Sequence, residues 1–547
     1  MSTIEQPQPH RNFFIIARSL FVALSMVGVC LLLLLPYHAV HAQTAPTVNY
    51  NPDINTIFIG SDPGVGVVPG SQVITLQNLA TTLAAAGATD VIVNQGNGVW
   101  LSTARIEVKA SGRLDIIKND QLTELRLESI IGKLAYIKLQ DGGYLHLDGV
   151  KVTSWDTTTN AVDETIPDGR AYILAQEGSR IDVLRSEIAY LGDASGSNTS
   201  GLAWVKRSNA ADPATGSTGL VQESKIHHNF QGIYVSEGIS LTMSTNDVYS
   251  NLNNGIWVRD GSRSITVAGN TVHENGDTAT GSGDGIVFYN SSIQNTIRNN
   301  KVYSNAGNGI VIERASNNNT ITANEVYQNG DGIAISDADN NVVQGNTAHN
   351  NSNGIRISGS QNNPAAGNQI IGNTVRDSQS TNGNAYGIYL YNHADSNVIR
   401  NNTILRSATY GIYIKSGGNR IEGNNIREGK TGLAIVGEAE SIGQIPLLVL
   451  SGASNVVISS TITGNSDIGI RVEGGVRNGI GADPATGAPL AGNNVSSNGG
   501  NGIFLKNTSA GYSSTDNFVI GNTIHANGSA GVVVKDAGSD RNRLSNN

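Results

Sequence analysis

The chain has 547 residues, a formal net charge of −9 and a pI near 5.6. No basic run stands out, so binding to nucleic acid by neutralising phosphates is not expected. Aromatic residues make up only 5% and charged residues 14%, while 65 residues are glycine. This composition suits a narrow, repetitive coil with many turns better than a bulky core.

The N-terminus is typical of a secretory signal peptide. Two arginines precede an apolar run that ends at Leu35, and small residues follow up to Ala42. Residues 1–42 are therefore predicted to be a signal peptide of a protein that is secreted, periplasmic or on the cell surface. We expect no membrane association after cleavage, and the alternative is an uncleaved anchor. The only cysteine, Cys30, lies in this segment, so the remaining chain has no thiol for a disulfide.

The next segments are predicted to lead into a solenoid. Residues 43–70 are interpreted as an extended lead-in, and residues 71–99 as an N-terminal capping region. Three leucines at helical spacing, followed by Gly87, predict a short amphipathic helix over 75–86. Such a helix would cover the open end of the first coil, whose edges would otherwise stay unpaired.

From about residue 220 the chain repeats a Gly-Ile step followed by alternating apolar residues. Six of the eleven intervals between repeats are 21 to 24 residues long, and the others fit one unit plus an insertion. A repeat of this length is typical of a solenoid. The step begins at Gly232, Gly255, Gly285, Gly309, Gly332, Gly354, Gly387, Gly411, Gly432, Gly469, Gly502 and Gly531.

The local pattern selects the type of solenoid. Alternating Ile and Val after each glycine predicts short strands with one buried face, and Asn, Gly, Ser and Asp between them predict tight turns. Three strands per coil give an all-β, right-handed parallel β-helix over residues 100–547. A recurrent Asn, as at Asn246 and Asn270, is expected to stack on itself at one corner. The longest intervals, near 255–285, 354–387, 432–469 and 469–502, predict protruding loops.

Several blocks between residues 155 and 335 are more specific than strand repeats. They include Asp168-Gly-Arg-Ala-Tyr-Ile, Ser186-Glu-Ile-Ala-Tyr-Leu-Gly, Gly201-Leu-Ala-Trp, Glu223-Ser-Lys-Ile-His-His-Asn and Gly309-Ile-Val-Ile-Glu-Arg. In these blocks the chain resembles the secreted alginate (mannuronan) C5-epimerases of bacteria, over about a third of its length. The resemblance implies a β-helix whose partner is an acidic polysaccharide such as alginate.

The resemblance also shows where the chain departs from the family. Epimerisation at C5 needs a positive group against the carboxylate, a base for the C5 proton and an acid on the opposite face. The family's base is a His in an Asp-Pro-His-Asp-Arg-Ser motif after a Gly-Ile, and this chain has Arg259 at that position. The family's carboxylate-neutralising Arg comes one coil later, where this chain reads Tyr289-Asn290. Because a guanidinium is no base near neutral pH, we expect weak or absent epimerase turnover.

A relocated site is an alternative. If neighbouring coils stack in register, His227 or His228 would approach Arg259, which would neutralise the carboxylate while a His or Tyr takes the proton. The bland alternative is that the two histidines are polar turn residues without chemistry. The predicted catalytic residues are Arg259, Asp260, His227 and His228, and the predicted substrate-binding residues are Trp257, Tyr234, Glu237 and Tyr289.

Three function classes stay open. The first is an enzyme on an acidic glycan, either an epimerase or a lyase. The second is a carbohydrate-binding solenoid without catalysis, and the third is a structural, adhesin-like surface protein. No cofactor is expected, although the Asp-rich stretch 336–340 could hold Ca²⁺ between coils or simply make turns. We expect a monomer.

Overall fold

The computed structural model describes most of the chain. No helix in this part is long and apolar enough to cross a bilayer. The predicted signal peptide, residues 1–42, lies outside the described residues. The described residues are 47–60, 72–206, 216–380, 383–442 and 445–547.

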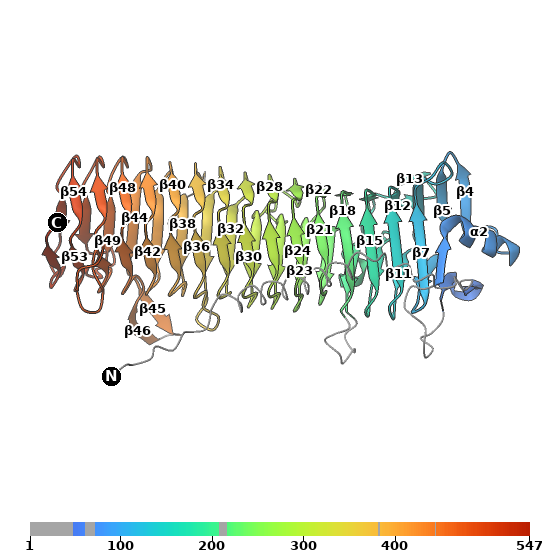
Figure 1. Cartoon of the computed structure of the whole chain (residues 1–547), viewed down its shortest axis with the longest axis horizontal. Coiled ribbons are helices and arrows are strands. Elements are labelled where there is room, and N and C mark those ends of the chain that lie inside the picture. The colour runs from blue at the N-terminus through green and yellow to red at the C-terminus, as the bar shows by residue number, and fades with distance from the viewer. Residues whose placement is uncertain (1–46, 61–71, 207–215, 381–382, 443–444) are drawn as a thin grey trace, which may run out of the picture. The chain divides into compact units, whose positions relative to one another are not determined.

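The described residues wind into a rod, and each coil contributes one strand to each of three parallel sheets, A, B and C (Figure 1). Sheet A contains β1 (Val48–Asn51), β2 (Thr56–Ile59), β6 (Arg105–Val108), β10 (Ile137–Leu139), β14 (Ile173–Ala175), β17 (Gly201–Val205), β20 (Gln231–Ser236), β23 (Ile256–Arg259), β26 (Ile286–Tyr289), β29 (Ile310–Glu313), β32 (Asp331–Ser336), β35 (Asn353–Ser358), β38 (Tyr386–Tyr391), β41 (Tyr410–Lys415), β44 (Thr431–Val436), β49 (Ile470–Glu473), β52 (Ile503–Lys506) and β55 (Val532–Val534).

Sheets B and C complete each coil. Sheet B contains β3 (Gln72–Thr75), β7 (Gly112–Ile117), β11 (Tyr144–Asp148), β15 (Arg180–Leu184), β18 (Thr218–Gln222), β21 (Thr242–Ser244), β24 (Thr266–Ala268), β27 (Thr296–Arg298), β30 (Thr320–Thr322), β33 (Val342–Gln344), β36 (Gln369–Ile371), β39 (Val398–Arg400), β42 (Arg420–Glu422), β47 (Val456–Ile458), β50 (Gly479–Ile480), β53 (Phe518–Ile520) and β56 (Arg543–Ser545). Sheet C contains β4 (Ile92–Gly96), β5 (Val99–Ser102), β8 (Glu124–Ile130), β9 (Lys133–Leu134), β12 (Lys151–Asp156), β13 (Ala161–Val162), β16 (Glu187–Ala189), β19 (Lys225–His227), β22 (Asp247–Tyr249), β25 (Thr271–His273), β28 (Lys301–Tyr303), β31 (Glu325–Tyr327), β34 (Thr347–His349), β37 (Thr374–Arg376), β40 (Thr403–Leu405), β43 (Asn425–Arg427), β48 (Thr461–Thr463), β51 (Asn494–Ser496) and β54 (Thr523–His525).

A few elements lie outside the parallel stacks. β1 pairs antiparallel with β2, and β4–β5, β8–β9 and β12–β13 are antiparallel hairpins. A further hairpin, β45 (Ala439–Ile442) and β46 (Ile445–Leu450), extends from the rod between β44 and β47 (Figure 1). Two short 3-10 helices are η1 (Pro52–Ile54) and η2 (Ser197–Thr199). The predicted all-β parallel β-helix is confirmed.

The repeated glycines lie where the chain enters sheet A. The residue after each glycine is paired with its counterpart in the next coil, and Ile256, Ile286 and Ile310 are fully buried in one inward column. A side chain at Gly309 would place a Cβ 2.3 Å from Val326 Cγ1 and 2.6 Å from the carbonyl oxygen of Gly332. Only glycine fits this entry point, which explains the repeat. The predicted stacking of the twelve glycine steps on one face is confirmed.

Buried asparagines form ladders at all three kinds of corner, and not only at the one predicted. At the corner from B to C, Asn270 Nδ2 donates to Asn300 Oδ1 at 3.0 Å, and Asn300 Nδ2 donates to Asn324 Oδ1 at 2.9 Å. A second ladder at the corner from C to A includes Asn251 and Asn275. A third, at the corner from A to B, is formed by residues such as Asn295, Asn319 and Asn341. Each amide satisfies turn backbone groups that water cannot reach.

The N-terminal end is covered by α2 (Leu76–Ala85), as the leucine spacing predicts (Figure 1). Its leucines are buried, and Thr75 caps its N-terminus by accepting a hydrogen bond from the Asn78 amide at 3.2 Å. The coil stacking starts earlier than the predicted residue 100, however. β2 already pairs in parallel with β6, and β3 with β7, because the alternating residues 56–59 form a strand of the first coil.

Candidate functional site

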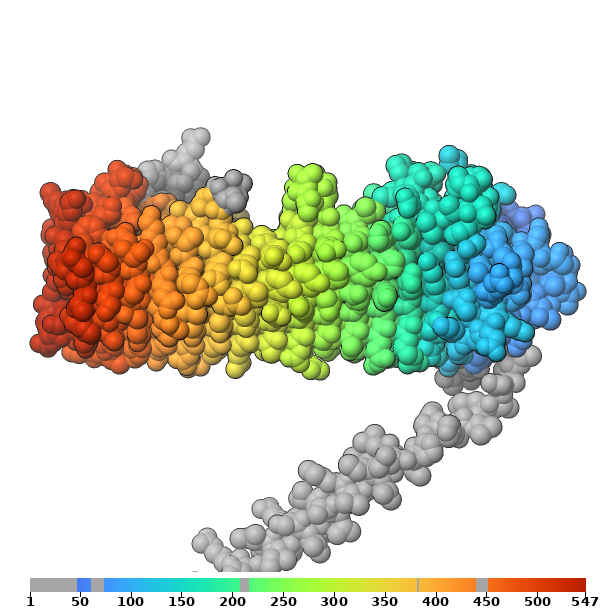
Figure 2. Space-filling model, turned by 90° about the horizontal axis from the view of Figure 1, so that it is seen from above, coloured from blue at the N-terminus to red at the C-terminus, as the bar shows by residue number. Residues whose placement is uncertain are grey.

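Loops gather at both edges of sheet A. Most corners from B to C are only two residues long, as between β21 and β22, whereas insertions such as 274–285 and 359–368 lie at the corners that flank sheet A. Figure 2 shows one protruding segment in yellow-green, the colour of residues near 280. The loops predicted at the four longest intervals are confirmed, although the last, 481–493, lies at a B-to-C corner. The outer face of sheet A is therefore the face that the insertions border.

Two columns of side chains run along this outer face. Residues two positions after the repeated glycines form one column, in which Tyr234 is paired with Trp257 and Trp257 with Val287. Residues four positions after the glycines form the second, in which Arg259 is followed by Tyr289 and then Glu313. Neighbouring members lie one strand spacing apart, about 4.8 Å.

Arg259 is half-buried between two aromatic rings. Its Cζ lies 4.8 Å from the ring centroid of Trp257 and 5.2 Å from that of Tyr289. Its Nε lies 2.7 Å from Asp260 Oδ2, and Asp260 also accepts from Ser236 Oγ at 2.9 Å. Burial lowers the pKa of Arg259, but Tyr234, Asp260 and Tyr289 outweigh that effect, and the net direction is upward. Arg259 therefore stays charged and cannot be a general base.

Arg314 supplies a second guanidinium that sequence reasoning missed. Its Cζ lies 5.0 Å from the ring centroid of Tyr289, so two cations flank this ring. Arg314 reaches back from the coil after Tyr289, near the place where the resembling family would have its neutralising Arg. Its place in the sequence could have indicated this role, because Arg314 directly follows Glu313, which lies in the same column as Arg259 and Tyr289.

Glu313 is the second residue that sequence reasoning missed. Among the described residues, burial and neighbouring charges act on its carboxyl group, and no hydrogen bond does. Burial raises its pKa, the nearby Asp284 raises it further, and Arg314 lowers it. A half-buried carboxyl of this kind is a candidate for proton transfer.

Of the predicted substrate-binding residues, Tyr234 is buried, whereas the side chain of Glu237 is 43% exposed. Tyr234 is only 2% exposed and packs with Leu174 and Ala203. Its ring meets Trp257 edge-on at 5.4 Å, so it packs beside Trp257 from the preceding coil. Glu237 lies just past β20, with its carboxylate 3.5 Å from Lys206 Nζ. Direct substrate contact by Tyr234 was therefore wrong.

The relocated site that joins the two histidines to Arg259 is also wrong. His227 ends a strand of sheet C, and His228 occupies the corner that follows, whereas Arg259 lies on sheet A. His227 lies five residues before Gly232, the repeat glycine of its coil, whereas Arg259 lies four residues after Gly255. The two residues therefore occupy different positions in their coils, and stacking one coil on the next does not bring them together. The two histidines share a hydrogen bond between their Nδ1 atoms, which are 2.8 Å apart. Burial lowers the pKa of both.

His227 instead begins a ladder of stacked rings on the outer face of sheet C. It stacks on Tyr249 at 4.8 Å, and Tyr249 stacks on His273 at 5.3 Å. Three more rings continue the ladder with interplanar angles of 3° to 6°: Tyr303, Tyr327 and His349. These rings cover one another's faces, which stabilises the coils but leaves no flat ring surface for a ligand.

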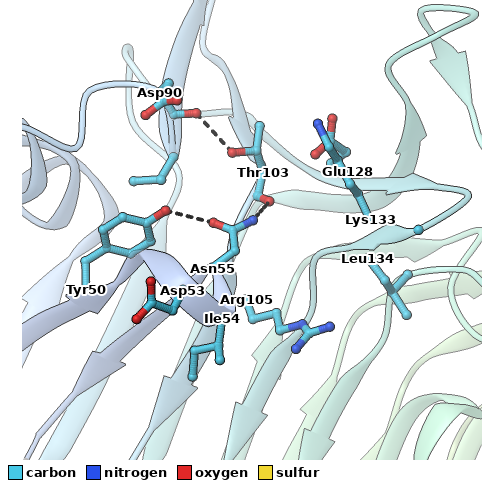
Figure 3. Close-up of a pocket in the computed structure, with 12 residues that line it drawn as sticks. Tyr50, Asp53, Ile54, Asn55, Asp90, Thr103, Arg105, Glu128, Lys133 and Leu134 are labelled. Carbon is cyan, nitrogen blue, oxygen red and sulfur yellow. Dashed lines mark hydrogen bonds between the residues drawn. The ribbon is translucent and has the colours of Figure 1, made fainter.

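Two hollows in the early coils are lined by polar and charged side chains. The one in Figure 3, of about 560 Å³, lies beside β1, β6 and the β8–β9 hairpin. There Tyr50 Oη donates to Asn55 Oδ1 at 3.0 Å, and Asn55 Nδ2 donates to the Thr103 carbonyl at 2.8 Å. A second cavity, of about 290 Å³, contains His228, Tyr190 and Arg170. Arg170 Nε donates to the Gly192 carbonyl at 2.8 Å, so this residue ties loops together.

No metal centre is built from the residues described. Among them, no three His, Cys, Asp or Glu side chains are grouped to hold an ion. In the Asp-rich stretch 336–340, Asp339 Oδ1 accepts a hydrogen bond from the Ala366 amide at 2.7 Å. Calcium binding there stays a prediction.

The comparisons with known proteins agree with this fold. The family model described as "Right handed beta helix region" matches residues 148–317, 278–394, 317–478 and 372–547. A crystal structure of a periplasmic alginate epimerase AlgG mutant is 22% identical with a TM-score of 0.54, covering 66% of this chain and 81% of that one. A second AlgG mutant is 21% identical, also with a TM-score of 0.54, covering 72% and 82%.

AlgG without a substitution is 18% identical with a TM-score of 0.50, covering 88% of this chain and 85% of its own. No curated protein matches the sequence. At these identities the likeness to solved structures shows the fold alone. The family model spans well over half of the chain. The right-handed winding that it describes is the one expected where parallel strands are joined by crossover connections. The chain therefore belongs to the family of right-handed β-helix proteins.

Proposed function

We propose that this protein binds an extended acidic polysaccharide along the outer face of sheet A, and that Trp257, Arg259, Tyr289 and Arg314 hold one uronate residue. The observation that carries the proposal is the pair of guanidinium groups on the ring of Tyr289. The parallel coils repeat side-chain positions at a constant spacing, which suits a linear polymer.

The chemistry of these groups fits a uronate. A planar guanidinium binds a carboxylate through two parallel hydrogen bonds, and an aromatic ring packs against the apolar face of a sugar. Asp260 offsets part of the charge of Arg259, so Arg314 supplies the net positive charge. Trp257, half-buried and packed beside Tyr234, offers the packing surface.

Binding of a uronate at this site does not require that the protein catalyse epimerisation as the resembling family does. Arg259 stands where that family has its base, and it stays protonated. We therefore propose a secreted or periplasmic polysaccharide-binding protein whose epimerase turnover is weak or absent. The fold is similar to that of AlgG, a periplasmic alginate epimerase, and alginate is therefore the first glycan to test.

Calorimetric titration of the protein with short oligomannuronates tests the proposal. Replacing Arg259→Ala or Arg314→Ala is expected to weaken binding by roughly 10- to 100-fold, since each removes a charge-assisted contact. The matched control is Arg298→Ala, an exposed arginine on sheet B, which should leave the affinity unchanged. Absence of binding by the unmodified protein, or equal effects of all three substitutions, would refute the proposal.

A further inference from the structure

A second aromatic cluster lies on the same outer face of sheet A, further along the rod. Its members come from the adjacent strands β38 and β41. Ring centroids within it lie 4.3 Å to 5.7 Å apart. We call the following five residues the tyrosine cluster: Tyr386, Tyr389, Tyr391, Tyr410 and Tyr413.

The cluster continues the two columns of the proposed uronate site. Tyr389 and Tyr413 belong to the column of Trp257, and Tyr391 belongs to the column of Arg259. From β23 to β38 the sheet advances five strands, which corresponds to about 24 Å. The two aromatic sites therefore lie on one line.

The residues between the two sites are small or polar. In the column of Trp257 the intervening side chains are Val287, Val311 and Ala334, which are nearly fully buried, and then Arg356, which is half-buried. In the column of Arg259 two serines follow Glu313, and Arg356 Nη1 donates to Ser358 Oγ at 2.9 Å. The two long side chains on this path are Glu313 and Arg356, and the ion pair of Arg356 with Asp331 holds its guanidinium in place.

Ring orientation distinguishes Tyr413 from the rings of the sheet C ladder, whereas Tyr389 is itself stacked on Tyr386 at 23° and on Tyr391 at 13°. Tyr413 is tilted by 49° from Tyr386, by 56° from Tyr410 and by 69° from Tyr389. None of these three neighbours stacks on its face. A ring held at such angles can pack against a sugar, whereas rings stacked at a few degrees cannot.

Two of the five hydroxyl groups of the cluster accept hydrogen bonds from arginines. Arg356 Nη1 donates to Tyr391 Oη at 3.4 Å, and Arg471 Nη1 donates to Tyr410 Oη at 3.3 Å. Each oxygen accepts from an arginine, so its own hydrogen is available to a carboxylate or hydroxyl of a ligand. Burial raises the pKa of Tyr389 and Tyr413, so they stay neutral.

We infer that the tyrosine cluster is a second binding site for the same uronate polysaccharide, so that one chain spans both sites. The inference rests on the proposed function at Arg259. Its direct consequence is that affinity depends on chain length, because a glycan long enough to reach both sites binds the second one intramolecularly.

The experiment compares an oligomannuronate trimer with a decamer by calorimetry on the full chain. The decamer is expected to bind roughly 100-fold more tightly than the trimer. The double substitution Tyr389→Ala and Tyr413→Ala should remove this advantage and leave trimer affinity unchanged, whereas Arg259→Ala should weaken both. The matched control, Tyr303→Ala in the sheet C ladder, should change neither affinity.

Each remaining outcome is decisive. If trimer and decamer bind equally and both depend on Arg259, the proposed function stands and the second site is wrong. If the trimer depends on the tyrosines and not on Arg259, the uronate site itself is misplaced. If neither oligosaccharide binds, both proposals fail. Should the double variant not fold, Tyr413→Leu alone, with the same pair of ligands, gives the same comparison.

Discussion

Trp257 and Arg259 lie two residues apart on β23 and point to the same side of sheet A, with the guanidinium carbon 4.8 Å from the indole centroid. Alternation along a strand puts residues two apart on one face. The ion pair with Asp260 then holds the guanidinium in place. A cation and an aromatic surface are thus presented together to a ligand on the outer face.

Trp257→Ala should weaken both oligomannuronate binding and the fold. The indole covers Tyr234 and packs beside Val287, so its loss is expected to lower the free energy of unfolding by about 1–3 kcal/mol. Trp257→Phe, which keeps a ring, should recover most of both. Chemical denaturation and calorimetry measure the two effects. An unchanged affinity for Trp257→Ala would show that the indole does not contact the glycan.

The unmodified protein is expected to show weak or no epimerase turnover on poly-mannuronate. The position of the resembling family's base is Arg259, and general base catalysis typically contributes 10²–10⁴-fold. Arg259→His alone should not restore full activity, because it removes the ion pair with Asp260 and one of the two cations at Tyr289. Proton NMR of the C5 configuration measures turnover. Robust activity of the unmodified protein would identify a different catalytic group, and Glu313 is then the first to replace.

Glu313→Gln should stabilise the fold at neutral pH. Burial raises the pKa of Glu313, so its neutral form favours the folded state. That contribution is complete below the ordinary Glu pKa, about 4.3, and is lost as pH rises through the raised pKa. The variant should therefore exceed the unmodified protein in unfolding free energy at pH 7, and the difference should vanish at acidic pH. Glu422→Gln on sheet B, which breaks an ion pair with Arg420, should show no such gain.

The histidine pair predicts a loss of stability on acidification. Burial lowers the pKa of His227 and His228, so their contribution is complete above the ordinary His pKa, about 6.5, and is lost as pH falls through the lowered values. His227→Phe keeps the stack on Tyr249 and should flatten the decline between pH 8 and pH 5. His525→Phe, at the exposed end of the same sheet, is the control. The affinity for oligomannuronate should not change in either variant. A loss of affinity in His227→Phe would show that His227 belongs to the binding site.

The asparagine ladders should be the most sensitive part of the fold. Asn300→Ala removes the oxygen that accepts from the Asn270 amide at 2.9 Å and the Nδ2 group that donates to the Val267 carbonyl at 2.9 Å. Leaving such groups buried without partners should cost about 2–4 kcal/mol. Gln369→Ala, an exposed amide on sheet B, should cost little. Urea denaturation separates the two, and equal midpoints would mean that water replaces the ladder.

The sequence by itself determined the β-helix. The Gly-Ile steps mark the entry to sheet A because a Cβ at that point would collide with the neighbouring coil. Alternation after each glycine then assigns buried and outward positions, which is why Trp257, Arg259 and Tyr289 could be placed on one face from the sequence. The capping helix and the protruding loops follow from leucine spacing and repeat length in the same way.

Only the tertiary structure decided what surrounds these positions. His227 lies on sheet C because a corner separates it from the strand of sheet A that follows. The position of a residue within its coil therefore decides its sheet, and the number of coils between two residues does not. Tyr234 is buried because side chains from earlier coils pack against it, and Arg314 reaches back to Tyr289 because a long side chain can cross one strand spacing. Repeat periodicity determines backbone register, whereas side-chain reach and burial depend on neighbours that are one whole coil away in the sequence.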